Sequence, residues 1–397
     1  MMKWATSIAE GLSPDLALKH CISEIQEVLG PDPVDLVFVF LSPHYQKTYE
    51  EIPAQVMKGL QCGTLIGCSA AGIIGGGREI EQKAALSLTA ARLPNVSLKP
   101  FYAGMGQLPT LDASPQTWRD WVGIPSGQIP HFVILADPFS FNPEGLLLGL
   151  DFAFPQSSKV GGLASGAVRP GVNALFLNEA IYRNGLVGLS LVGNIMVDTV
   201  VAQGCRPIGY PMHITQCDQN LLLGLDREKP INILKELLDS LDDQDRELAQ
   251  HSLFLGIVMD PLKEDLKQGD FLIRNIRFEP LNGVLAVGAD LHEGQTVQFH
   301  LRDSKTSSED LDLMLTRHLM EHNPRVSQGA LLFSCLGRGQ HLYGYPNHDS
   351  DLFRQKMGSI PLGGFFCNGE IGAVGPSTYL HGYTSCFGIF RPIQDIH

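Results

Sequence analysis

The sequence predicts an α/β (α+β) protein of two domains, in which mixed and antiparallel sheets are flanked by helices. Its 397 residues exceed what a single hydrophobic core usually holds. Short apolar runs that stop abruptly and lead into helical patterns recur along the chain. Between them, Asn-Gly pairs separate strand-like segments, and such pairs are a strong signal for antiparallel hairpins. We divide the chain into domains at 1–225 and 226–397.

Composition excludes several classes of protein. Hydrophobic residues make up 44% and charged residues 18% of the chain, which is typical of a globular protein. The net charge is −13 and no Lys/Arg-rich block occurs, which argues against nucleic acid and anionic membrane surfaces as partners. No apolar run reaches the roughly 18 residues of a membrane span, and no secretory signal is present. We therefore expect a cytoplasmic protein without membrane insertion.

One pattern occurs three times: a buried strand, a sharp stop, a helix and a Gly-rich turn. The strands are predicted at 34–41, 132–136 and 331–333. The turns follow at 65–72, 160–166 and 362–369. A weaker fourth strand of this kind is predicted at 254–259. We interpret the pattern as internal duplication of one supersecondary unit, the alternative being chance similarity among common buried strands and Gly turns.

Other elements follow from local signals. Helices are predicted at 13–28, 49–60, 230–241 and 307–321 from helical spacing of apolar residues and from capping residues. Asn184-Gly185 predicts a hairpin between 174–182 and 186–192. Asn282-Gly283 predicts a second hairpin between 271–281 and 284–288, which 296–301 extends into a meander.

Common catalytic and metal-binding signatures are absent. The eight cysteines form no Cys-x-x-Cys pair and the histidines no His-x-His, so we expect reduced thiols and no metal. Phosphate-binding glycine loops, His-Glu-x-x-His and Gly-x-Ser-x-Gly are also missing. The sequence therefore indicates no cofactor and assigns no catalytic residue.

The densest group of polar residues is C-terminal. Gly337 and Gly339 flank Arg338 directly after a buried strand, where binding sites are usually built. Glycines let the backbone approach a ligand while a guanidinium binds an anion. Opposed charges of Arg338 and Glu370 would suit a zwitterion such as an amino acid. We predict ligand-binding roles for Cys335, Gly337, Arg338, Gly339, Asn368, Gly369, Glu370, His381 and Thr384, with Cys68 and Ser69 in second rank.

A structural interpretation of the same residues stays open. Arg338 and Glu370 could form an ion pair that only joins two turns. Cys335 could be a small buried hydrophobe, and His381 a hydrogen-bonded structural residue.

Ordered motifs along most of the chain resemble the FIST family. Those at 67–72 and 203–209 are similar to the FIST N domain. Those at 272–276, 297–303, 333–339, 364–371 and 381–384 are similar to the FIST C domain. The two halves would cover about residues 30–225 and 226–390. In bacteria such domains occur beside kinase, chemotaxis and cyclic-nucleotide output domains, and in eukaryotes beside an F-box.

The resemblance implies a sensory module for small molecules, amino acids among them. The two halves fill this chain, so we expect a sensor that lacks its own output domain and acts through a separate signalling partner. Two alternatives remain: a cysteine-dependent enzyme, with Cys335 as nucleophile and His341 or His381 as base, and a scaffold that recruits a protein. We expect a binding protein rather than an enzyme because no third orienting residue is evident.

Overall fold

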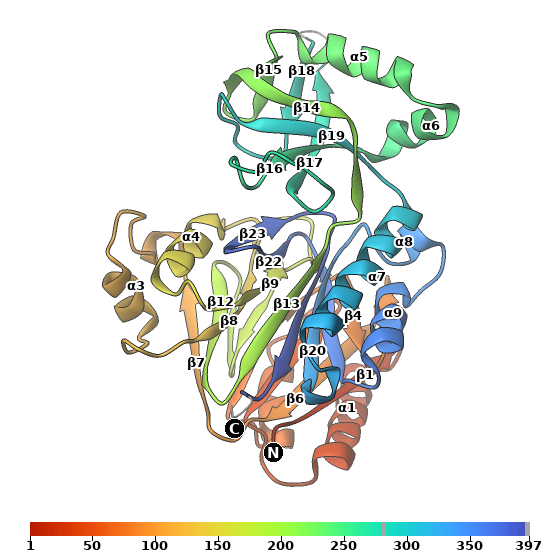
Figure 1. Cartoon of the computed structure of the whole chain (residues 1–397). Coiled ribbons are helices and arrows are strands. Elements are labelled where there is room, and N and C mark those ends of the chain that lie inside the picture. The colour runs from red at the N-terminus through yellow and green to blue at the C-terminus, as the bar shows by residue number, and fades with distance from the viewer. Residues whose placement is uncertain (280–282, 394–397) are drawn as a thin grey trace. The chain divides into compact units, whose positions relative to one another are not determined.

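The computed structural model describes residues 1–279 and 283–393 (Figure 1). It confirms the α/β class with mixed and antiparallel sheets. The chain forms two compact units. The larger contains residues 1–201, 313–380 and the chain from 384 onward, and the smaller contains 202–312 with 381–383.

The larger unit is built from three copies of one sequence of elements. The first copy contains β1 (Lys3–Glu10), α1 (Pro14–Leu29), β2 (Leu36–Leu41), η1 (Pro43–Thr48), α2 (Ile52–Leu60), β3 (Thr64–Ser69), β4 (Gly72–Gly75), β5 (Arg78–Glu81) and β6 (Ala85–Arg92). The second contains β7 (Val96–Ala103), η2 (Met105–Gln107), α3 (Pro115–Val122), β8 (His131–Ala136), α4 (Glu144–Ala153), β9 (Lys159–Leu163), β10 (Leu175–Leu177), β11 (Ala180–Tyr182) and β12 (Leu186–Gly193). The third contains β13 (Met196–Ala202), α7 (Ser304–Glu321), η3 (Pro324–Val326), β20 (Gly329–Cys335), α8 (Gln340–Tyr343), α9 (His348–Met357), β21 (Leu362–Cys367), β22 (Glu370–Val374), β23 (Ser377–His381) and β24 (Ser385–Arg391). The first half of α7, up to residue 312, is grouped with the smaller unit.

Three six-stranded sheets follow the same plan, and the copies exchange hairpins in a cycle. The strand orders are β1-β6-β2-β3-β10-β11, β7-β12-β8-β9-β22-β23 and β13-β24-β20-β21-β4-β5. Each sheet has one parallel pair at its centre: β2–β3, β8–β9 or β20–β21. The hairpin that follows each parallel pair joins the sheet of another copy. The internal duplication predicted from the sequence is therefore confirmed, with three interlocked copies.

Glycines permit the parallel pairs to form. A Cβ added at Gly67, Gly161 or Gly364 would lie 1.8–1.9 Å from a carbonyl oxygen of the neighbouring parallel strand. Such a distance is far below van der Waals contact, so a larger residue would have to push the two strands apart. This close approach explains why the Gly-rich turn recurs in all three copies.

The apolar core lies where the three sheets face one another. Phe40, Leu135 and Phe333 contribute to one buried cluster, each from the central strand of a different sheet. Helices cover the outer faces, as Figure 1 shows for α1 beside β1. Across residues 1–279 and 283–393, no helix has both the length and the apolar character needed to cross a membrane.

The smaller unit is a closed barrel with strand order β14-β15-β18-β17-β16-β19. Its elements are β14 (Cys205–Asp218), β15 (Leu221–Leu225), α5 (Pro230–Ser240), α6 (Asp243–Ser252), β16 (Leu253–Val258), β17 (Phe271–Glu279), β18 (Val284–Val287) and β19 (Thr296–Arg302). They are inserted into the third copy between β13 and α7. Each compact unit therefore consists of separate segments of the chain, and no single boundary at residue 225 divides the two units. The division into 1–225 and 226–397 stays a prediction about family halves. The predicted fourth copy at 254–259 is β16 of this barrel.

Two predicted strand pairings were wrong. β11 pairs with β10, whereas β12 pairs with β7 and β8, so Asn184-Gly185 carries the chain from one sheet to another. β19 pairs with β14 and β16 instead of extending the hairpin of β17 and β18. The pairing of β17 with β18 is confirmed, although residues 280–282 of its turn lie outside the described residues. In the first error the stretch 174–182 also forms two short strands, β10 and β11, instead of one, and in both errors the tertiary fold selects the neighbour of a strand.

We predict that Gly67→Ala destabilises the protein by about 3 kcal/mol, because the new methyl group would overlap the carbonyl oxygen of Val39. Gly106→Ala is the control, since a Cβ there would have no atom within 4 Å. Urea unfolding followed by circular dichroism measures both variants. Equal midpoints for the two would contradict the steric role of Gly67.

Candidate functional site

The loop after β20 places Arg338 inside the larger unit. Its backbone N–H donates to the carbonyl of Cys335 at 2.8 Å, which closes a tight turn, and its side chain is fully buried. Gly339 follows with φ of +67°, a conformation that favours glycine. A Cβ at Gly339 would also strike the carboxylate of Glu81. The glycine predicted to let a ligand approach therefore admits a side chain of the protein itself.

Asp349, at the start of α9, is the carboxylate partner of Arg338. The two meet through paired hydrogen bonds, Nε to Oδ2 at 3.0 Å and Nη2 to Oδ1 at 3.1 Å. Nη2 also donates to the Tyr343 hydroxyl at 2.6 Å. Ser334 and Ser385 both donate to Oδ2 of Asp349. Burial alone would raise the pKa of Asp349, but the charge of Arg338 outweighs it and holds the pKa well below the usual range.

Glu79 of β5 belongs to the same buried cluster. Its Oε1 accepts a hydrogen bond from the Ser350 N–H at 2.7 Å. Burial, followed by the charge of Asp349, raises the pKa of Glu79 to about 8, so its carboxyl is largely protonated at neutral pH. Its Oε2 and Nη1 of Arg338 are buried and lack hydrogen-bond partners among the described residues. The cluster thus combines a satisfied ion pair with two unpaired polar atoms.

Cys335, Glu370 and Thr384 come together beside the loop that carries Arg338. Oε2 of Glu370 accepts from the N–H of Thr384 at 3.2 Å and from its hydroxyl at 2.8 Å. The N–H of Cys335 donates to the carbonyl of Thr384 at 2.9 Å, and its Sγ accepts from the Gly337 N–H at 3.4 Å. The carboxylate that forms paired hydrogen bonds with Arg338 is Asp349, whereas Glu370 accepts hydrogen bonds from Thr384.

Asn368, Gly369 and Ser69 lie where strands of different copies meet. The N–H of Asn368 donates to the carbonyl of Leu163 at 3.1 Å, and the carbonyl of Gly369 accepts from the Leu163 N–H at 2.9 Å. The carbonyl of Ser69 accepts from the Gly166 N–H at 3.2 Å. These hydrogen bonds join the ends of β3, β9 and β21. The sequence did not indicate this structural role.

Cys68 and His381 are the two remaining residues with predicted ligand-binding roles. Cys68 lies in the apolar core, and burial raises the pKa of its thiol well above the usual range. His381 is buried and falls with the smaller unit. Ligand-binding roles for both remain predictions.

Sequence reasoning missed Asp349, Glu79 and Tyr343. An acidic residue in the first turn of a helix, as at Asp349, is usually explained by the helix dipole. Glu79 lies in a short strand in which three of four residues are charged, a composition typical of exposed segments. Its burial comes from contacts far along the chain, 271 positions away at Ser350. No local signal could have revealed these residues.

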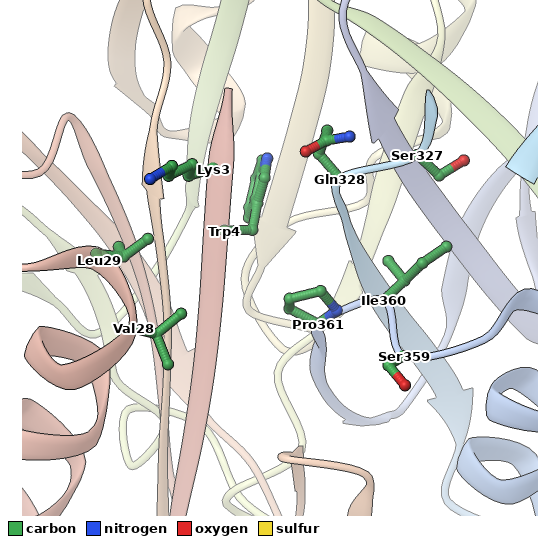
Figure 2. A pocket seen from close by; sticks show the side chains of 9 residues that line it. All are labelled: Lys3, Trp4, Val28, Leu29, Ser327, Gln328, Ser359, Ile360 and Pro361. Carbon is green, nitrogen blue, oxygen red and sulfur yellow. The ribbon is translucent and has the colours of Figure 1, made fainter. Parts of the chain in front are cut away.

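A pocket of about 400 Å³ opens elsewhere on the larger unit (Figure 2). It is lined by Lys3, Trp4, Val28, Leu29, Ser327, Gln328, Ser359, Ile360 and Pro361. In Figure 2, Trp4 lies between Lys3 on one side and Gln328 and Pro361 on the other.

Two buried polar atoms belong to residues of this pocket. Trp4 is 4% exposed and Ser327 is 7% exposed, yet Trp4 Nε1 and Ser327 Oγ have no hydrogen-bond partner within the described chain. The ring of Trp4 stacks on Phe390 with centroids 4.6 Å apart and lies against the bare backbone of Gly329. The indole is therefore fixed in position while its N–H is left without an acceptor. Sequence analysis did not select any of these residues.

Comparisons with known proteins cover nearly the whole chain. Residues 35–228 match the FIST N domain and residues 230–373 match the FIST C domain. An uncharacterized protein of Mycobacterium tuberculosis is 34% identical over 369 residues, which is 92% of this chain and 93% of that protein. Human F-box only protein 22 is 33% identical over 96 residues, 23% of each chain. A crystal structure of a cyanuric acid hydrolase from A. caulinodans aligns with 99% of this chain and 100% of its own, with a TM-score of 0.36 and 7% identity, too remote to bear on function.

We predict that Arg338→Ala lowers the free energy of unfolding by about 3–5 kcal/mol, because it leaves the Asp349 carboxylate buried without its cation. Arg354→Ala is the matched control, since its pair with Asp351 is exposed and should contribute about 0.5 kcal/mol or less. Denaturant unfolding compares the two variants. A loss below 1 kcal/mol for Arg338→Ala, on the order of a surface pair, would contradict a structural role for the pair.

A second prediction concerns pH. The pKa of Glu79 in the folded protein, about 8, lies above its ordinary value of 4.5. Between these values the unfolded chain releases the proton that the folded chain retains, so stability falls as pH rises, by roughly 1 kcal/mol per pH unit. Glu79→Gln should remove most of this slope, whereas Glu51→Gln, an exposed control, should keep it. Unfolding free energies across this pH range measure the difference, and parallel curves for wild type and Glu79→Gln would refute it.

Proposed function

The chain belongs to the FIST family, and on that basis we propose that it is a small-molecule-binding sensory protein. FIST domains are associated with small-ligand sensing in signalling proteins. The observation that supports binding in this chain is the pocket around Trp4. Its volume of about 400 Å³ lies in the usual range for small-molecule sites, and two residues that line it, Trp4 and Ser327, carry buried polar atoms without partners in the described chain.

The residues of the pocket favour a small acid with an apolar body. The indole N–H of Trp4 can only donate, so it calls for an acceptor such as a carboxylate oxygen. Lys3 supplies the one cation among the nine described lining residues, and none of the nine is acidic. Val28, Leu29 and Ile360 offer apolar contact. A monoanion therefore suits the pocket better than a zwitterion, whose ammonium group would find no carboxylate there.

The zwitterion hypothesis based on Arg338 and Glu370 is the weaker alternative. A ligand carboxylate at Arg338 would have to compete with Asp349 for the paired donors or use Nη1 alone. A ligand ammonium at Glu370 would compete with Thr384 for Oε2.

The position of the pocket suggests how binding could be transmitted. Lys3 and Trp4 belong to β1 of the first copy, whereas Ser327, Gln328 and Pro361 flank β20 and β21 of the third. A ligand in contact with both would stabilise one packing of the two copies over others. We propose that a separate signalling protein binds one packing of the two copies more tightly than the other.

A cysteine-dependent enzyme is a second candidate, favoured by one observation. Sγ of Cys335 accepts a hydrogen bond from the Gly337 N–H, a contact that stabilises a thiolate, and Cys335 precedes the buried cation of Arg338 by three residues. Alkylation followed by peptide mass spectrometry tests it. A nucleophilic Cys335 would react near neutral pH much faster than Cys217, the other partly exposed cysteine, whereas equal rates would remove this candidate.

We predict that a screen of small carboxylic acids and amino acids by thermal shift finds carboxylic acids that raise the melting temperature. Trp4→Phe should weaken their binding about 10-fold or more, because it keeps the stacked ring but removes the N–H that a carboxylate would accept. Ser327→Ala should act in the same direction.

Trp121→Phe is the matched control because Trp121 does not line this pocket. Ligands whose affinity is equal in wild type, Trp4→Phe and Ser327→Ala would bind elsewhere and would contradict the proposed site. Ligands weakened by Arg338→Lys instead would favour the Arg338 cluster.

A further inference from the structure

Three potential metal ligands meet in the larger unit, away from both sites above. Asp198 lies in β13, His318 in the last turn of α7, and His322 one residue beyond that helix. The N–H of His322 donates to the carbonyl of His318 at 2.9 Å, so the helical turn continues through it. A separation of four positions therefore places both imidazoles on one face of the helix.

The three side chains are close enough to share one ion. One ligand atom from each lies within 4.8 Å of the others. Nε2 of His322 is 3.6 Å from Oδ1 of Asp198, and the two imidazole rings stack with centroids 4.6 Å apart. Ligand atoms around one zinc ion are about 3.4 Å apart, given bonds near 2.1 Å, so small side-chain rotations would complete such a site.

Two buried nitrogens of this group have no hydrogen-bond partner. They are Nε2 of His318 and Nδ1 of His322, judged within residues 1–279 and 283–393. His318 is 5% exposed, so its nitrogen has little access to water. Leaving such a group unsatisfied costs about 1–3 kcal/mol and calls for an explanation. For Nε2 of His318, a metal ion that accepts its lone pair provides one, whereas the nitrogen of His322 that lies 3.6 Å from Asp198 is Nε2.

Asp198 already has a cationic partner in Arg391, so neutralising its charge does not explain why two histidines lie beside it. Arg391 already holds this carboxylate by paired hydrogen bonds, Nε to Oδ2 at 2.6 Å and Nη2 to Oδ1 at 3.0 Å. Each carboxylate oxygen keeps a second lone pair for a metal. The contact with Arg391 fixes the orientation of Asp198, as outer hydrogen bonds commonly do for carboxylate ligands.

We propose that Asp198, His318 and His322 bind a divalent zinc ion. Two imidazoles and one carboxylate suit zinc and related transition metals, whereas magnesium and calcium prefer oxygen ligands alone. Three protein ligands leave the fourth position of the tetrahedron for water or a ligand group. His322, whose side chain is 30% exposed, lies on the route from solvent. This proposal is independent of the pocket around Trp4.

The expectation of no metal rested on Cys-x-x-Cys and His-x-His spacings. His318 and His322 have the wider His-x-x-x-His spacing of two ligands on one helix face, which the sequence analysis considered only in the form His-Glu-x-x-His. Asp198 lies in a strand far earlier in the chain, and only the fold brings it to the histidines.

The test uses the full chain, stripped of metal with EDTA and then dialysed. Zinc binding is measured by competition with a chromogenic chelator, and cobalt is the spectroscopic probe for a tetrahedral site. We expect one zinc per chain and visible cobalt absorption. His318→Ala and His322→Ala should each weaken zinc binding at least about 10-fold. His44→Ala, an exposed histidine on the same unit, should leave it unchanged.

Circular dichroism and urea unfolding establish that each variant is folded. If His318→Ala does not fold, His322→Ala decides, because His322 is partly exposed. Zinc bound at well below one equivalent by the wild-type chain overturns the proposal. So does zinc affinity that survives His322→Ala in a folded protein. Failure of this test would leave small-molecule binding at the Trp4 pocket unaffected, since the two sites share no residue.

Discussion

The larger unit depends on the close approach of three parallel strand pairs. Gly67, Gly161 and Gly364 each let a carbonyl oxygen of the adjacent strand occupy the space that a Cβ would fill. Each parallel pair presents an edge that a hairpin from another copy completes. No copy can therefore form its full sheet alone, and the shared apolar core is assembled only when all three copies are in place.

This interlocked arrangement positions the polar groups as well. Arg338 extends from the loop after β20 toward the first turn of α9, while β5 of the first copy supplies Glu79 to the same cluster. The low dielectric constant of the interior strengthens the attraction between Arg338 and Asp349 and makes a second ionised carboxylate costly. Burial favours the protonated form of both carboxyls, but the charge of Arg338 keeps the pKa of Asp349 low, whereas burial and the charge of Asp349 raise the pKa of Glu79.

The Trp4 pocket and the histidine group share a physical feature with that cluster. In each, buried polar atoms are held in place by packing but lack partners among the described residues. Trp4 is fixed by Phe390, and Asp198 is fixed by Arg391. Folded proteins leave few such atoms unsatisfied, and the two at the pocket and the two at the histidine group support the functions proposed there.

The sequence by itself determined the fold class, the three copies and the membership in the FIST family. These properties are local: apolar runs mark buried strands, and glycines mark the points of close approach. Its grouping of Cys335, Glu370 and Thr384 is also reflected in their hydrogen bonds, because these residues flank strands of one copy.

Only the tertiary structure decided the partners. Arg338 pairs with Asp349, the Asn184-Gly185 segment joins two sheets, and Trp4 of the first copy lines one pocket with Ser327 of the third. Hairpin exchange places residues from distant parts of the chain side by side, and the sequence pattern of a strand does not specify its neighbour. Burial then determines which carboxyl groups are ionised, because each carboxylate in the interior needs a cation, a proton or a set of donors within hydrogen-bonding distance.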